Sequence, residues 1–93
     1  MIKANTYFED QVKSLGYETK EGKSSIGVME AGTYEFGTTA HETMVVIEGE
    51  LKVILPGATE AISYKSGEKF EVEANVSFKV EAIGQTSYLC IYK

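Results

Sequence analysis

The chain has 93 residues, which is enough for one domain and too few for a separate cofactor-binding domain. Its 14 acidic and 9 basic residues give a net charge of −5, which argues against a protein that binds nucleic acid through a basic surface. A hydrophobic share of 43% and a charged share of 25% are typical of ordinary soluble globular domains. The net negative charge does not exclude a site for a small anion, because a few local hydrogen-bond donors outweigh the weak electrostatic field of the whole protein.

Two features of the sequence bear on its compartment. No apolar run approaches about 18 residues and no charged-then-apolar leader stands at the start, so we expect neither a membrane span nor a signal peptide. Cys90 is the single cysteine and cannot form an intramolecular disulfide. A reducing compartment is the simple interpretation, and we expect a cytoplasmic protein.

The first 25 residues are expected to form an N-terminal arm and the first turns. Residues 1–16 carry scattered apolar side chains, such as Val12 and Leu15, without a helical stripe. We expect this part to be an extended arm, with at most one short helical turn, that covers an edge of a sheet. Residues 20–25 (KEGKSS) are predicted to form a polar turn.

From residue 26 onward the chain consists of short apolar runs separated by breaks that are rich in glycine. The predicted strands are 26–36, 43–55, 61–64, 69–73, 76–83 and 87–92. Gly49 interrupts the second run, and a turn at Pro56 and Gly57 ends it. Several short strands with glycine-bearing turns and no helical period indicate an all-β barrel or sandwich. The first two runs are expected to form an antiparallel pair.

The polar segment between these two runs, residues 37–42 (GTTAHE), is the predicted functional site. It contains the single histidine, His41, directly before Glu42. Catalytic zinc and iron sites take about three N, O or S ligands from the protein, and neighbours on a strand point to opposite faces. We therefore expect no metal site.

The spacing from Glu42 to Gly49, E-x6-G, resembles the end of the first signature of the cupin superfamily. In metal-binding cupins, three histidines accompany the two signatures. The corresponding positions here hold Phe36, Thr38 and Phe78, so the resemblance is to a cupin without those histidines. One alternative is a metal-dependent cupin oxygenase or isomerase. Metal analysis of the purified protein would decide against it if no stoichiometric metal is found.

Seven short motifs, in matching order and spacing, make the resemblance more specific. They are N-x-Y-F at 5–8, V-K-S-L-G at 12–16, S-I-G-V-M at 25–29, G-x-Y-x-F at 32–36, E-x-M at 42–44, L-P at 55–56 and S-Y-L-C at 87–90. Together they resemble the pyrimidine/purine nucleoside phosphorylases, a family of very small cupins, from end to end of the chain. The resemblance implies an all-β fold, a single-domain cupin (RmlC-like jelly-roll) β-barrel over residues 1–93, with the barrel in residues 26–93.

The family resemblance implies phosphorolysis, in which a nucleoside and inorganic phosphate give a free base and a pentose 1-phosphate. It also implies broad tolerance of purine and pyrimidine nucleosides, no metal or other cofactor, and a homodimer, for which unpaired strand edges give a physical reason. Ile91 stands where some members have a basic residue, so the phosphate ligands stay open. The alternative is a non-catalytic cupin that binds a sugar or nucleoside, and phosphate-dependent turnover distinguishes the two.

Two residues are candidates for catalysis. In phosphorolysis the bond to the base breaks while phosphate attacks C1′, so the transition state resembles an oxocarbenium ion. Glu42 is predicted to bind the ribose hydroxyls or to face the developing positive charge, and a loop carboxylate in a turn hydrogen bond is its structural alternative. His41 is predicted to protonate the leaving base, because imidazole exchanges protons near neutral pH, and an exposed loop histidine is the alternative.

Other residues are candidates for substrate binding. The hydroxyls of Thr38 and Thr39, with backbone N–H groups around Gly37, are predicted to donate to phosphate, and plain turn formation is the alternative. Three aromatic residues are predicted to stack on the base, with a place in the barrel core as the alternative: Tyr34, Phe36 and Phe78. Lys13 is predicted to bind phosphate from the arm, and a solvated surface lysine is its alternative.

Overall fold

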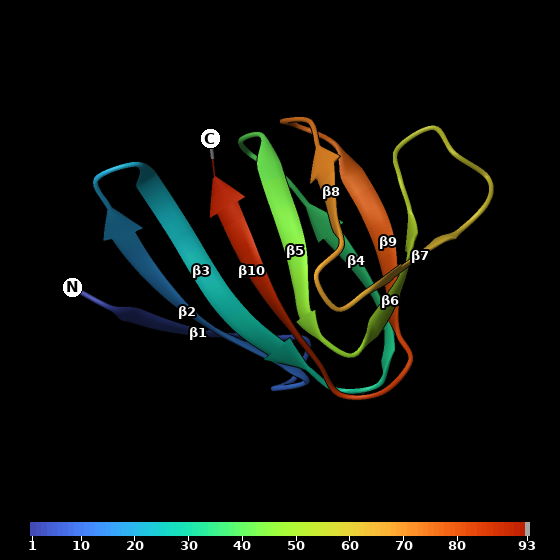
Figure 1. The fold of residues 1–93 in the computed structure, drawn as a ribbon, viewed down its shortest axis with the longest axis horizontal. Helices are drawn as coiled ribbons and strands as arrows, with labels where there is room; N and C mark the ends of the chain where they lie inside the picture. The colour runs from blue at the N-terminus through green and yellow to red at the C-terminus, as the bar shows by residue number, and fades with distance from the viewer. Residues whose placement is uncertain (93) are drawn as a thin grey trace.

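The computed structural model describes residues 1–92, which form ten β-strands (Figure 1). In chain order these are β1 Lys3–Tyr7, β2 Val12–Thr19, β3 Gly22–Met29, β4 Gly32–Gly37, β5 Glu42–Glu48, β6 Glu50–Ile54, β7 Ile62–Lys65, β8 Lys69–Val72, β9 Ser77–Ala82 and β10 Thr86–Tyr92. The expected all-β class is therefore confirmed. The described part of the chain has no helix long and apolar enough to cross a membrane.

The strands form two antiparallel sheets that stack face to face (Figure 1). One sheet has six strands in the order β1-β2-β3-β10-β5-β8, and the other has four in the order β4-β9-β6-β7. Apolar side chains from both sheets meet in one buried core, which includes Met29, Val46, Leu51, Val53 and Val80. Burial of this apolar surface is the main favourable term that holds the two sheets together.

The expectation of an extended arm over residues 1–16 is wrong. Here β1 and β2 form a hairpin, and β2 pairs with β3 from Val12↔Met29 to Thr19↔Gly22, so the N-terminal segment supplies two strands of the six-stranded sheet. The predicted polar turn at 20–25 is shorter than expected, because β3 already begins at Gly22. The sequence did not predict these strands, because the inward positions after Val12 are Ser14 and Gly16 and therefore show no alternation of apolar and polar side chains.

The two runs around residues 37–42 do not pair with each other, so that expectation is also wrong. The first run is split into β3 and β4 by a break before Gly32, and β4 pairs with β9 in the four-stranded sheet. β5 lies in the opposite sheet, where it pairs with β10 and β8. Residues 38–41 thus carry the chain from the four-stranded sheet to the six-stranded sheet.

Other predicted breaks are confirmed. Gly49 has φ of +105° and separates β5 from β6, a conformation that favours glycine. After β6, the Ala58 N–H donates to the Leu55 carbonyl at 3.0 Å while Gly57 has φ of +79°. Pro56 followed by a glycine of positive φ is the pattern of a type II turn, which ends this strand as expected.

Candidate active site

A pocket of about 140 Å³ opens between the two sheets, near the start of β5 and the end of β10. We call it the barrel pocket. Its walls come from both sheets and combine aromatic rings with a few polar groups: Phe36, Glu42, Phe78, Tyr88, Cys90 and Tyr92. The same pocket is also lined by Tyr7 and Ser14 from the N-terminal hairpin. Such an apolar cavity with convergent polar groups is the usual form of a small-molecule site.

Glu42 is the first residue of β5, and its backbone pairs with Tyr92 on β10 and with Val72 on β8. The Cys90 thiol donates a hydrogen bond to Glu42 Oε1 at 3.4 Å. Burial raises the pKa of Glu42 above its ordinary value, while the thiol hydrogen bond and the nearby His41 lower it by less. A carboxyl with a raised pKa takes up and releases its proton closer to neutral pH than an exposed one.

The groups around Glu42 are neutral hydrogen-bond donors. Burial raises the pKa of the Cys90 thiol and of the Tyr88 and Tyr92 phenols, with Glu42 adding to each shift, so all three groups stay protonated. The Tyr92 hydroxyl is held at 2.9 Å from Ser25 Oγ. The Cys90 side chain is free and buried. Among the described residues, the pocket lining therefore combines one carboxyl with neutral donors.

The three predicted aromatic residues fall in two groups. Phe36 and Phe78 both line the barrel pocket and stack on each other with centroids 5.8 Å apart at 29°. Tyr34 does not line this pocket; it is buried, and its hydroxyl donates to the Glu30 carbonyl at 2.7 Å. Phe8, from the loop between β1 and β2, covers Tyr34 and Phe36 with centroid distances of 5.0 and 5.4 Å.

Thr38 is buried and serves the turn between β8 and β9. Its hydroxyl donates to the Glu73 carbonyl at 2.7 Å and accepts from the Val76 N–H at 3.1 Å. Thr39 next to it is exposed, and neither threonine lines the barrel pocket, whereas Gly37 does. The structure thus occupies the Thr38 hydroxyl with the turn, in agreement with the structural alternative for this residue.

His41 and Lys13 lie away from the barrel pocket lining. The His41 Nε2 atom is 3.1 Å from Glu71 Oε1, and the imidazole is partly exposed. Lys13 is exposed on β2 between Val12 and Ser14, which are both buried on the inner face. Since side chains alternate along a strand, Lys13 points to the outer face of the six-stranded sheet.

Ile91 also points to this outer face. On β10 the residues that line the barrel pocket are Tyr88, Cys90 and Tyr92, and Ile91 alternates with them. A basic side chain in its place would point away from the pocket. The departure at Ile91 therefore removes no phosphate ligand from the barrel pocket of this chain.

Sequence reasoning found Glu42, Phe36 and Phe78 but missed Tyr7, Ser14 and Tyr92 as lining residues. The alternation of Tyr88 and Cys90 on the last strand was the one signal that would have extended to Tyr92. Across residues 1–92, no group of three or more His, Cys, Asp or Glu side chains is placed to hold a metal ion.

A comparison with protein families decides where the chain belongs. Residues 2–92 match the family model described as pyrimidine/purine nucleoside phosphorylase. The chain belongs to the pyrimidine/purine nucleoside phosphorylase family. A relative in this family, from Shewanella halifaxensis and named pyrimidine/purine nucleoside phosphorylase, is 52% identical over 99% of both chains.

Solved structures agree with the fold. A protein of unknown function from Vibrio parahaemolyticus is 46% identical and superposes with a TM-score of 0.94, covering 97% of this chain and 96% of the other. An RmlC-like cupin from Shewanella frigidimarina superposes with a TM-score of 0.72 at 13% identity, over 96% and 80% of the two chains. The predicted cupin fold of this phosphorylase-family chain is confirmed.

Proposed function

We propose that this protein is a nucleoside phosphorylase of broad specificity, which converts purine and pyrimidine nucleosides and inorganic phosphate to free base and pentose 1-phosphate. The observation that carries the proposal is the full-length match to the family, with a relative of that name 52% identical over 99% of both chains. The chemistry of the barrel pocket supports it independently, because the pocket pairs one carboxyl with an aromatic wall.

Glu42 is the residue we propose to act on the sugar. An oxocarbenium-like transition state carries positive charge near C1′, and a carboxylate that is partly removed from water stabilises this charge more strongly than an exposed one. The hydrogen bond from Cys90 fixes the position of Glu42 Oε1 before the substrate arrives. Because Glu42 is already in place, less free energy is needed to reorient groups of the barrel pocket during the reaction.

The stacked pair Phe36 and Phe78 is the surface we propose for the base. Every nucleobase has a π face, so stacking binds purines and pyrimidines with little selection between them. Among the predicted site residues, Glu42, Phe36 and Phe78 share the barrel pocket, which makes them stronger candidates than His41, Thr38, Thr39, Tyr34 and Lys13. The protonated Tyr88 and Tyr92 phenols are available there to donate hydrogen bonds to substrate oxygens or base nitrogens.

We propose that phosphate is the co-substrate and that no metal or organic cofactor takes part. Support comes from the residues at the positions of the cupin histidines, Phe36, Thr38 and Phe78, none of which is a metal ligand of the nitrogen or carboxylate type. Activity that survives treatment with a chelator, together with metal analysis of the purified protein, tests this point.

The buried free thiol of Cys90 supports a reducing, cytoplasmic environment.

The test of function is release of free base from uridine and adenosine, with and without inorganic phosphate, in metal-free buffer. Release that requires phosphate and yields pentose 1-phosphate supports the phosphorylase. Release without phosphate indicates a hydrolase. Binding of a nucleoside without any release indicates a non-catalytic binding cupin.

We also propose that the protein is a homodimer that packs through the outer face of the six-stranded sheet. There, Leu15, Ile26, Leu89 and Val45 are paired in one cross-strand row over β2, β3, β10 and β5. Leu15 and Ile26 are 51% and 43% exposed, and Val28 beside the row is 51% exposed. A contiguous apolar face of this kind typically marks an interface. It lies on the side of the sheet opposite to the barrel pocket.

A further inference from the structure

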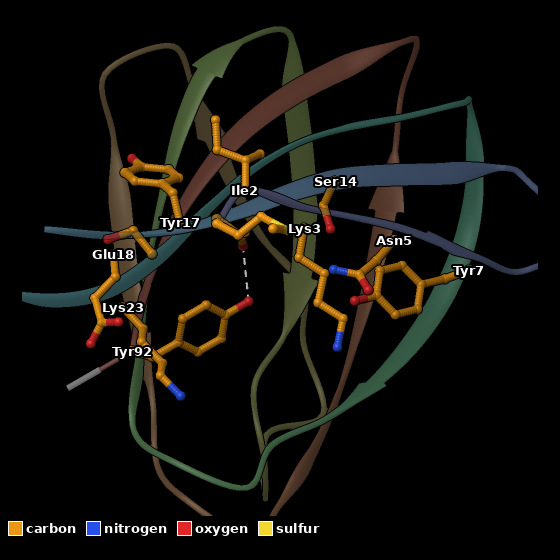
Figure 2. Close-up of a pocket in the computed structure, with 13 residues that line it drawn as sticks. Ile2, Lys3, Asn5, Tyr7, Ser14, Tyr17, Glu18, Lys23 and Tyr92 are labelled. Carbon is orange, nitrogen blue, oxygen red and sulfur yellow. Dashed lines mark hydrogen bonds between the residues drawn. The ribbon is translucent and has the colours of Figure 1, made fainter.

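A larger cavity, of about 480 Å³, lies beside the barrel pocket (Figure 2). We call it the side groove. It runs along the inner face of β1, β2 and β3, and it shares Tyr7, Ser14 and Tyr92 with the lining of the barrel pocket. The two cavities therefore meet at these three residues. A small ligand in the side groove lies next to whatever the barrel pocket holds.

The side groove exists because the N-terminal strands extend beyond the opposite sheet. Figure 1 shows β1, β2 and β3 at one side of the molecule, while the strands of the four-stranded sheet stack against the other side. The floor of the groove consists of small residues, with Gly16 paired to Ser25 across β2 and β3, and Ser14 beside them. Short side chains on an uncovered sheet face leave room for a ligand.

Among the described residues that line this groove, two are lysines, Lys3 on β1 and Lys23 on β3. Among the described lining residues the acidic one is Glu18, so the groove has a local excess of positive charge in a protein of net charge −5. The Asn5 amide and the Tyr92 hydroxyl add neutral donors, and Figure 2 shows these side chains around one opening. Cations and neutral donors together are the chemistry that binds a phosphate group.

The sheet register places Lys23 two strands away from Glu42 in the same row. Tyr92 pairs with Lys23 on β3 and with Glu42 on β5, so the three residues form one cross-strand row on the inner face. Neighbouring strands are about 4.8 Å apart, so the backbones of Lys23 and Glu42 are on the order of 10 Å apart, with the Tyr92 phenol between them. That separation leaves space for a pentose between a phosphate near Lys23 and a base in the barrel pocket.

The barrel pocket itself is a poor place for phosphate. Its volume is about 140 Å³, and Glu42, the one carboxyl among its described lining residues, repels an anion. Phosphate is stabilised by positive charge and the oxocarbenium-like carbon by negative charge. The side groove has the lysines and the barrel pocket has Glu42, so two adjoining cavities provide the two charges.

We propose that the side groove is the phosphate subsite of this enzyme, with Lys3 and Lys23 holding the anion and Asn5 and Tyr92 donating hydrogen bonds. This inference rests on the proposed phosphorylase function. Hydrogen phosphate approaches from the groove, and one of its oxygens forms the new bond to C1′ as the C1′–N bond breaks. The bonding electron pair leaves with the base nitrogen, and the proton of hydrogen phosphate ends on the base. The products are the neutral base and pentose 1-phosphate.

Steady-state kinetics with two varied substrates test the subsite. We expect the double variant Lys3→Gln/Lys23→Gln to raise KM for phosphate by about tenfold or more, because charge-assisted hydrogen bonds are lost, while KM for uridine changes by less than about twofold. Lys52→Gln is the matched control, since Lys52 is exposed on β6 and does not line the groove. An unchanged phosphate KM in an active double variant, or an equal rise in both KM values, overturns the subsite.

A second measurement keeps the subsite testable if the wild-type protein releases no base and the proposed function fails. Inorganic phosphate is titrated into the ¹⁵N-labelled protein and the amide shifts are followed. Shifts at Lys3, Asn5, Gly16 and Lys23 that are absent in the double variant support a phosphate site in the groove. Shifts confined to other residues, or none, overturn it.

Discussion

The Tyr88 ring lies directly over Gly27 on the neighbouring strand. Gly27 on β3 and Tyr88 on β10 are paired in the sheet, and a Cβ atom on Gly27 would come within 2.5 Å of the ring and hydroxyl atoms of Tyr88. The absence of a side chain at Gly27 therefore lets the ring lie flat on the inner face, where it forms part of the barrel pocket wall.

Gly27→Ala is expected to destabilise the protein by about 1–3 kcal/mol, because the new methyl group must displace the buried ring. Gly16→Ala is the matched control, since its Cβ would meet nothing nearer than the Lys3 carbonyl oxygen at 3.8 Å. Denaturant unfolding measures both variants. Equal stability of the two variants would contradict the close packing, and in a Tyr88→Ala background the penalty of Gly27→Ala is expected to disappear.

Glu42→Gln is expected to lower kcat by about 10²-fold or more, as for the loss of a group that stabilises transition-state charge. The amide keeps the shape and can still accept the Cys90 hydrogen bond, so the loss reports the charge. Glu35→Gln on the exposed face of β4 is the control and is expected to retain activity. Wild-type rates of base release in the Glu42→Gln variant would remove this residue from the mechanism.

The same Glu42→Gln change is expected to raise the unfolding temperature at neutral pH. Burial raises the pKa of Glu42 in the folded state, so between the unfolded and folded pKa values the folded protein binds more protons. Stability contributed by this residue thus falls as pH rises through that window, and glutamine removes the cost. Thermal melts from weakly acidic to neutral pH should show the variant's advantage shrinking as pH falls. A constant difference would contradict the raised pKa.

The native Cys90 thiol is expected to react with a thiol-specific reagent at least about tenfold more slowly than the same thiol in denaturant, because burial raises its pKa and the thiolate is the reactive form. A reagent that releases a chromophore measures both rates. Glu42→Gln removes a negative charge beside the thiol and should increase the native rate. A fast native reaction would show that the thiol is ionised or exposed.

Thr38→Val is expected to cost about 1–3 kcal/mol of stability, because the Glu73 carbonyl and the Val76 N–H lose their buried partner. Thr39→Val, at the exposed neighbour, is the control and should change stability little. Denaturant unfolding compares the two. If Thr38→Val left stability unchanged and instead raised KM for phosphate, the sequence-based role of Thr38 as a phosphate donor would stand.

Ile26→Glu is expected to produce a monomer, because it places a charge in the centre of the outer apolar row. Ile62→Glu is the matched control, since Ile62 is 50% exposed on β7 in the other sheet. Light scattering after gel filtration gives the mass of each variant. A wild-type monomer, or a dimer that persists in Ile26→Glu, would contradict the proposed interface.

The sequence predicted the strands after residue 26 well, because apolar runs there end at strong turn signals such as Gly49 and Pro56. It failed for the N-terminal hairpin, where the inner face carries Ser14 and Gly16 in place of apolar side chains. Without the hairpin, the sequence could not predict that Tyr7 and Ser14 line both cavities. The residues that line the side groove come mostly from four different strands and form no motif in the linear chain.

The same limit applies to the residues around Glu42. Ser25 and Tyr92 are hydrogen-bonded partners 67 positions apart, and only sheet pairing brings them together. Glu42 was found because it belongs to a local motif. Lys23 and Tyr92, which share a cross-strand row with Glu42, depend on register over most of the chain, and no local pattern encodes register at that range.

The alternation along β10 gives protein engineering two independent sets of positions on one strand. Tyr88, Cys90 and Tyr92 face the cavities, while Leu89 and Ile91 face the outer surface. Substitution at Leu89 or Ile91 therefore changes the proposed dimer interface, and it offers positions at which to attach the protein to a support. Substitution at Tyr88 or Tyr92 instead changes the wall of the barrel pocket, where we propose that the nucleoside binds, and leaves the outer face unchanged.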